Sequence, residues 1–222
     1  MTLLLHGALG TSKQFERLIQ QLGPDGRVDA INFSGHGGKV SSGQFSMEVF
    51  MEDLLNYLDE NKVDKVDVFG YSMGGYVALY TALRHPDRIG RIVTLGTKFD
   101  WTPESAAKET RMLNPDKIEE KVPAFAAKLQ KDHAPLDWKV VLQQTSAMML
   151  ELGNGNGLSW DVLPNIHHEV HICLGDHDNM VSQEESEKAA GLLPNGTFTL
   201  LEGVPHPIEK VDVKVLVDIV NR

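Results

Sequence analysis

Short apolar segments alternate with segments of helical periodicity along most of the chain, and this alternation constrains the fold more than any other feature. Each apolar segment has the length of one strand and is rich in Val, Ile, Leu or Phe. The segments expected to be strands are residues 3–5, 28–33, 66–69, 92–95, 170–174 and 198–201. Because strands this apolar are typical of a parallel sheet with helices on both faces, the sequence predicts an α/β fold with a mostly parallel sheet.

Apolar residues at intervals of three and four predict helices between these strands. Ser12 and Ser46 each precede such a segment and are expected to cap its first turn. A third helix is expected from Met73 to about Leu83, because Pro86 follows it closely, and a last one over residues 208–219.

Residues 101–165 interrupt the alternation. We find no convincing strand there, only helical pieces separated by prolines and by a Gly/Asn-rich run at 153–157 that we interpret as a turn. Helices inserted between two strands of a parallel sheet lie over the carboxyl ends of the strands, where ligands bind in such folds. We therefore expect a core of residues 1–100 and 166–222 and a helical cap of residues 101–165.

Composition excludes several kinds of partner. The 222 residues include 31 acidic and 21 basic side chains, for a net charge of −10, and no basic run offsets this charge locally. This balance argues against nucleic acid or an anionic membrane as a partner. Cys173, the only cysteine, lies in an apolar strand, so we expect a buried thiol. The first residues have neither a basic start nor a long apolar stretch, and we therefore expect a cytoplasmic protein.

The segment from Gly70 to Gly75 lies directly between a predicted strand and a predicted helix. A nucleophile at such a corner sits on a sharp, strained turn, so the residues two positions before and after it must be small. Gly70 and Gly74 meet this requirement around Ser72. The turn also places Ser72 at a helix N-terminus, where amide groups favour developing negative charge. Ser72 is therefore the predicted nucleophile.

With further motifs in a fixed order, the chain resembles the α/β-hydrolase superfamily over almost its whole length. The segments that carry the resemblance are residues 6–10 (the family's oxyanion loop), 34–37 (its G-H-G turn), 70–75 (its nucleophile elbow), 175–181 (its acid loop) and 204–206 (its histidine loop). The family order of serine, acid and histidine implies a triad of Ser72, Asp178 and His206. The resemblance also implies that the backbone N–H groups of Ala8 and Met73 form the oxyanion hole.

Three acidic residues compete for the place of the triad acid on sequence alone. Asp176 lies two residues before Asp178, and Asp100 follows the preceding strand, where some members of the family carry the acid. The spacing from Gly175 through Asp178 to Val181 matches the usual acid loop of the family and favours Asp178.

The other histidines are expected to be structural. His6 and His36 lie in turns, where they would bond to the backbone. His167, His168 and His171 resemble a metal-binding cluster in sequence, but only His171 is expected on a strand, with the other two in the preceding loop. We therefore expect no metal and no cofactor.

The family usually has two strands before the first one found here, and we expect both to be missing, because the first predicted strand begins two residues after Met1. The strand at 28–33 would then lie at an edge of the sheet, and an apolar edge invites pairing. We expect a homodimer or a local loop to cover it.

The sequence thus predicts an esterase-like or thioesterase-like serine hydrolase that cleaves small ester or thioester substrates through an acyl-enzyme on Ser72. Trp101, Phe125, Trp138 and the methionines of the cap suggest a partly apolar acyl pocket. One alternative is a C–C bond hydrolase or lyase of diketones or quinone precursors on the same triad. Another is a non-catalytic ligand-binding protein on a hydrolase scaffold.

Overall fold

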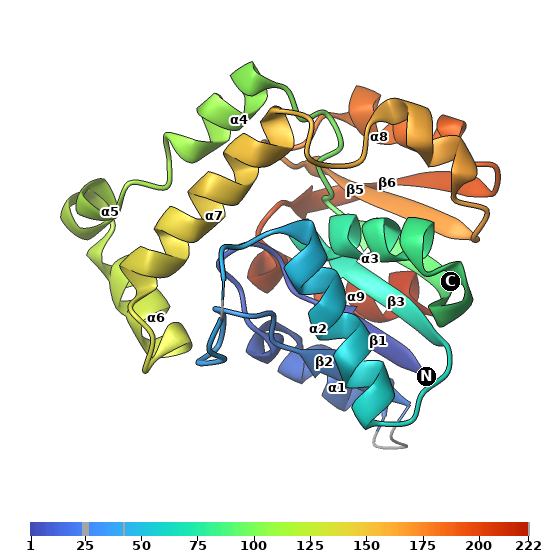
Figure 1. The fold of residues 1–222 in the computed structure, drawn as a ribbon, viewed down its shortest axis with the longest axis horizontal. Coiled ribbons are helices and arrows are strands. Elements are labelled where there is room, and N and C mark those ends of the chain that lie inside the picture. The colour runs from blue at the N-terminus through green and yellow to red at the C-terminus, as the bar shows by residue number, and fades with distance from the viewer. Residues whose placement is uncertain (24–26, 42, 222) are drawn as a thin grey trace.

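A six-stranded parallel sheet forms the centre of the molecule (Figure 1). The computed structural model describes residues 1–23, 27–41 and 43–221. The strands are β1 (Thr2–Leu5), β2 (Val28–Ile31), β3 (Val66–Tyr71), β4 (Ile89–Leu95), β5 (Val170–His177) and β6 (Gly196–Pro205), in the order β2-β1-β3-β4-β5-β6. This sheet confirms the predicted α/β class.

Helices cover both faces of the sheet because successive strand residues point to opposite sides. Leu3 and Leu5 pack into one core cluster, and Leu4 packs into the other. The first cluster includes α2 (Met47–Glu60), α3 (Met73–Arg84) and α8 (Gln183–Leu192), and the second includes α1 (Glu16–Leu22) and α9 (Val213–Val220).

Some predicted helix boundaries were wrong. Ser46 caps α2 by accepting a hydrogen bond from the Val49 N–H at 3.2 Å, as expected. Ser12 caps no helix, because it lies inside the short 3-10 helix Ser12–Phe15 and its own N–H donates to Asn32 Oδ1. The last helix begins at Val213 rather than at 208, because residues 208–210 form a separate 3-10 turn. Helix α8 was not predicted, since its sequence is mostly polar.

Four helices connect β4 to β5: α4 (Pro103–Thr110), α5 (Pro115–Lys121), α6 (Pro123–His133) and α7 (Trp138–Gly153). A proline begins each of the first three, where its missing N–H and fixed φ cost nothing. Ile118, Ala126, Leu129, Trp138 and Leu142 form a small separate core among these helices. Figure 1 shows the four helices beyond the ends of β1 and β3, on one side of the sheet. We call residues 101–165 the cap, following the proposed division.

β2 lies at an edge of the sheet, where the sequence placed it. Cys173 is fully buried in β5. In the part of the chain that the structure describes, no helix is both long and apolar enough to cross a membrane.

Candidate active site

Ser72 forms the turn between β3 and α3 by itself. Its backbone has φ 50° and ψ −115°, a strained conformation for a residue with a side chain. The turn is held by hydrogen bonds from the Ser72 N–H to Leu95 O at 2.8 Å and from Thr97 Oγ1 to Ser72 O at 2.9 Å. A Cβ atom on Gly70 or on Gly74 would collide with neighbouring backbone. The motif therefore requires glycine at these two positions because any side chain would collide with the backbone, as the sequence predicted.

Asp178 and His206 form a close pair at the ends of β5 and β6. His206 Nδ1 lies 2.7 Å from Asp178 Oδ2, and the side chains are only 8% and 2% exposed, respectively. Asp178 Oδ1 accepts hydrogen bonds from the N–H groups of Met180 and Val181 at 2.9 and 3.0 Å. Both carboxylate oxygens therefore have partners, which fixes the orientation of the imidazole.

The other two candidate acids lie elsewhere. Asp176 Oδ1 accepts a hydrogen bond from the Gly203 N–H at 2.7 Å and so ties the end of β6 to β5. Asp100 is exposed, and its N–H donates to Glu185. Among the three acids that the sequence offered, Asp178 is the one that the fold brings to His206.

Tyr71 contributes a contact that the sequence analysis did not anticipate. Its hydroxyl donates to the backbone oxygen of His206 at 3.0 Å. Burial raises the pKa of Tyr71 above its ordinary value, which keeps this hydroxyl a donor. The residue before the predicted nucleophile thus holds the loop that carries the predicted base.

Ser72 opens onto two narrow hollows of about 40 Å³ each. The first, which we call the histidine hollow, is lined by Ser72, His206, Lys98, Trp101, Glu109, Met149, Met180 and Val181. The second, the acyl hollow, is lined by Ser72, Ala8, Met73, Met47, Tyr76, Lys98, Trp101, Met148, Met149 and Leu152. The predicted nucleophile and base therefore share one hollow, and the two predicted oxyanion residues share the other.

The oxyanion loop passes close to Ser72 because Gly7 has no side chain. A Cβ atom there would lie 2.8 Å from the Tyr71 ring and 3.2 Å from Ser72 Cβ. Met73 is the first residue of α3, so its N–H has no partner within the helix. Met73 and Ala8 both line the acyl hollow together with Ser72.

The aromatic residues of the cap only partly match expectation. Trp101 lines both hollows, and its indole Nε1 is buried without a hydrogen-bond partner among the described residues. Trp138 instead packs in the core of the cap, and Phe125 is 40% exposed. The apolar wall is made mainly by methionines, with Lys98 and Glu109 as charged neighbours that the sequence analysis did not single out.

Buried histidines form hydrogen bonds with the backbone of the loops beside the site. His6 Nδ1 donates to Gly7 O at 2.8 Å, and His6 Nε2 accepts from the Phe33 N–H at 3.2 Å. Burial lowers the pKa of His6 to about 4 and holds that of His36 well below its ordinary value. Both side chains are therefore neutral at pH 7, in keeping with structural roles.

His133, which belongs to no recognised sequence motif, connects the cap to the core through hydrogen bonds of its ring. Its Nδ1 accepts from the Gly37 N–H at 3.2 Å, and its Nε2 donates to Leu9 O at 3.1 Å. These bonds join α6 to the G-H-G turn and to the oxyanion loop at once. No sequence pattern predicts this connection, because nothing around His133 shows which loops its side chain will contact.

Two of the three histidines considered as metal ligands lie within hydrogen-bond distance of other groups. His168 Nε2 lies 3.0 Å from Pro86 O, and His171 Nδ1 lies 2.7 Å from Thr197 Oγ1. Within residues 1–23, 27–41 and 43–221, no group of three or more His, Cys, Asp or Glu side chains could hold a metal ion.

The fold and this site define a class of protein, and comparison with known proteins identifies it. Residues 3–161 match the family model described as alpha/beta hydrolase fold. This match covers more than half of the chain, so the protein belongs to the α/β-hydrolase fold family.

Particular relatives within the family share parts of the chain. A segment of 107 residues is 38% identical to a pimeloyl-acyl-carrier-protein methyl ester esterase of Aromatoleum aromaticum, covering 47% of this chain and 40% of the relative. A segment of 96 residues is 34% identical to a putative 2-succinyl-6-hydroxy-2,4-cyclohexadiene-1-carboxylate synthase of Bacillus subtilis, covering 42% of this chain and 35% of the relative. The matched segments span less than half the length of these curated relatives.

Solved structures agree with the fold over the whole chain. A thermophilic esterase from Thermogutta terrifontis superposes with a TM-score of 0.76 at 22% identity, covering 99% of this chain and 87% of the other. At this identity the likeness concerns the fold alone.

Proposed function

We propose that this α/β hydrolase is a serine esterase or thioesterase that forms an acyl-enzyme on Ser72. The observation that carries the proposal is the placement of Ser72 on a strained elbow that shares a hollow with His206, whose Nδ1 lies 2.7 Å from Asp178 Oδ2. The similarity to a pimeloyl-acyl-carrier-protein methyl ester esterase supports the same reaction class.

In the proposed reaction, Ser72 Oγ attacks the carbonyl carbon of the substrate while His206 Nε2 takes the hydroxyl proton. The N–H groups of Ala8 and Met73 stabilise the negative charge on the carbonyl oxygen. The bond to the leaving oxygen or sulfur then breaks, and His206 gives that atom the proton. Water, deprotonated by His206, attacks the acyl-enzyme; the bond between the acyl carbon and Ser72 Oγ breaks, Oγ takes the proton back from His206, and the carboxylic acid is released. Asp178 stays ionised throughout and stabilises the imidazolium.

A fluorophosphonate probe and p-nitrophenyl acetate test this proposal together. We expect the probe to label the wild-type protein at Ser72 and the protein to hydrolyse the ester. Both signals should disappear in Ser72→Ala, because that variant lacks the nucleophile but keeps the fold. A folded wild-type protein with neither labelling nor ester hydrolysis would overturn the proposal and favour the ligand-binding alternative.

A C–C bond hydrolase or lyase on the same three residues is the second candidate. The similarity to a synthase of Bacillus subtilis favours it, as do the charged side chains of Lys98 and Glu109 in the histidine hollow, which suit a polar substrate. A panel of p-nitrophenyl esters, thioesters and vinylogous diketones separates the two functions. Turnover of diketones without turnover of esters would replace the first proposal by the second.

A further inference from the structure

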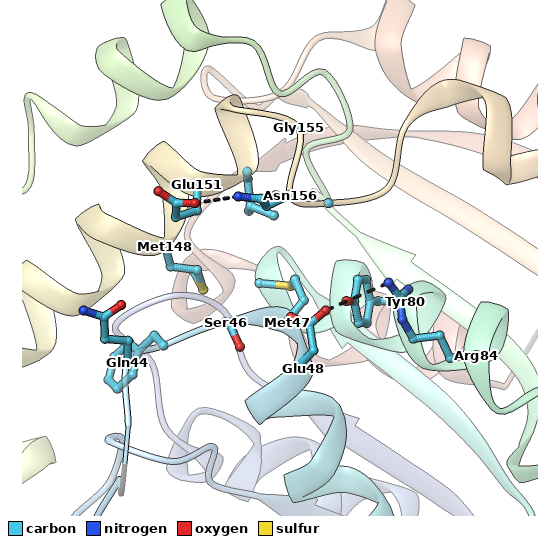
Figure 2. Close-up of a pocket in the computed structure, with 13 residues that line it drawn as sticks. Gln44, Ser46, Met47, Glu48, Tyr80, Arg84, Met148, Glu151, Gly155 and Asn156 are labelled. Atoms are coloured by element: carbon cyan, nitrogen blue, oxygen red, sulfur yellow. Dashed lines mark hydrogen bonds and ion pairs between the residues drawn. The ribbon is translucent and has the colours of Figure 1, made fainter.

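A third hollow, of about 650 Å³, lies outside the acyl hollow between the start of α2 and the end of α7 (Figure 2). We call it the outer hollow. Met47, Met148 and Leu152 line both the acyl hollow and the outer hollow, so these three side chains lie between the two hollows, and we call them the neck. Figure 2 shows Met148 pointing from α7 into the outer hollow, toward the start of α2. Displacement of these three side chains would open a path from Ser72 to the wider space of the outer hollow.

The positions of His206 and the oxyanion residues decide which part of a substrate takes this path. His206 must give its proton to the leaving atom, so the leaving group belongs in the histidine hollow. Ala8 and Met73, which would bind the carbonyl oxygen, line the acyl hollow together with the three neck residues. The acyl chain therefore extends on the side of the neck.

The neck suits a thin aliphatic chain. Its three side chains are at most 5% exposed and carry no charge. Methionine side chains are flexible and adapt to an inserted chain, and each buried methylene contributes about 0.8 kcal/mol of binding free energy, or roughly fourfold in affinity. A bulky ring fits a hollow of about 40 Å³ less well than an unbranched chain does.

The outer hollow combines a buried apolar floor with a polar rim. Phe45 and Tyr80 are buried, whereas Gln44 and Asn156 are exposed. Three charged side chains also line it, namely Arg84, Glu48 and Glu151. A carboxylate at the end of an acyl chain would meet the carboxylates of Glu48 and Glu151. An ammonium group would have to compete for these carboxylates with Arg84, whose Nη2 lies 3.9 Å from Glu48 Oε1, and with Asn156, whose amide donates to Glu151 Oε2. An uncharged group that can form hydrogen bonds avoids both conflicts.

We propose that the substrate has an unbranched acyl chain that runs from Ser72 between Met47, Met148 and Leu152 and ends, with an uncharged polar group, in the outer hollow. This inference rests on the proposed function, because it assigns the acyl side of an acyl-enzyme on Ser72. It adds the length, shape and end group of the acyl chain.

A series of p-nitrophenyl esters from acetate to decanoate tests the path. In the wild-type protein, we expect kcat/KM to rise by roughly threefold to fourfold per methylene once the chain enters the neck. Met148→Trp narrows the neck, so the ratio of kcat/KM for octanoate to that for acetate should fall at least tenfold. Gln44→Trp fills the outer hollow from an exposed position and should lower the values for octanoate and decanoate but not the value for acetate. Because Gln44 is exposed, this variant keeps the test valid if Met148→Trp fails to fold.

Leu150→Trp is the matched control, since Leu150 lies on the same helix but is 42% exposed and lines none of the three hollows. It should keep the wild-type ratio. The proposed path would be wrong if Met148→Trp and Gln44→Trp both hydrolyse esters with the wild-type ratio of kcat/KM for octanoate to acetate. That result would leave the proposed function unaffected. No hydrolysis of any ester by the wild-type protein would instead reject the proposed function.

The end group is tested with octanoyl esters that carry a terminal hydroxyl or a terminal carboxylate. We expect the hydroxyl ester to have the higher kcat/KM, by at least tenfold at low salt. A preference for the carboxylate would overturn the proposed end group.

Discussion

At the scale of single residues, Gly96 leaves the space in which the Asp178–His206 pair can form. A Cβ atom on Gly96 would lie 3.1 Å from Asp178 Oδ2 and 3.2 Å from His206 Nδ1, and the backbone there has φ +62°. We expect Gly96→Ala to lower both stability and kcat. Gly155→Ala is the control, because Gly155 has φ +93° but no atom near its Cβ position. Both variants should lose about 1–2 kcal/mol in free energy of unfolding, but only Gly96→Ala should lose activity. Equal activity in the two variants would contradict this account.

Asp178 and Asp176 offer a second comparison between neighbouring residues. Asp178→Asn leaves the site in place but no longer stabilises the imidazolium, so we expect kcat to fall by about 10⁴-fold. Asp176→Asn should weaken only the bond to the Gly203 N–H and change kcat little. Steady-state kinetics on p-nitrophenyl acetate measure both effects. A larger loss of kcat in Asp176→Asn than in Asp178→Asn would assign the acid differently.

At the scale of elements, sequence predicted best where packing and local chemistry coincide. The four inner strands β1, β3, β4 and β5 are apolar because they are mostly buried, and the elbow needs Gly70 and Gly74 whatever surrounds it. Helix α8 escaped prediction because its capping box, Ser182 with Glu185, begins a mostly polar segment. The contacts of Tyr71 and His133 could not be predicted, because each joins residues far apart in sequence that only the folded chain brings together.

Burial of neutral histidines in the loops makes the stability of the protein depend on pH. The unfolded chain binds a proton at His6 below about pH 6.5, whereas the folded chain keeps this side chain neutral down to a pKa of about 4. The unfolded state therefore binds more protons in this interval, and the free energy of unfolding falls as pH falls through it. At pH 5 the contribution of His6 should be about 2 kcal/mol smaller than at pH 7.

Urea unfolding of the wild-type protein and of His6→Gln at both pH values measures this contribution. Glutamine cannot take up the proton, so the variant should lose less stability between pH 7 and pH 5 than the wild-type protein does. The same loss in both proteins would show that His6 does not titrate in this way.

At the scale of the whole molecule, the edge strand β2 bears on self-association. Asp29 Oδ1 accepts a hydrogen bond from the Ala30 N–H at 2.7 Å, so the edge carries its own acceptor and an exposed charge. Charged side chains at sheet edges oppose pairing with another chain. We expect Asp29→Val to raise the average solution mass relative to the wild-type protein, as light scattering would measure. No change in mass would mean that Asp29 does not prevent pairing at the edge. The solution mass of the wild-type protein tests the predicted homodimer separately.

The central claim is that Ser72 carries the acyl group between the two halves of the reaction. The most direct test mixes the protein with a p-nitrophenyl ester, stops the reaction in acid within the first turnover, and maps the peptides by mass spectrometry. We predict that the peptide containing Ser72 gains the mass of the acyl group, together with a burst of p-nitrophenol equal to the enzyme concentration. Turnover of the ester with the acyl group on another residue would contradict the claim. Turnover with neither an adduct nor a burst, after deacylation has been slowed by low pH, would also contradict it.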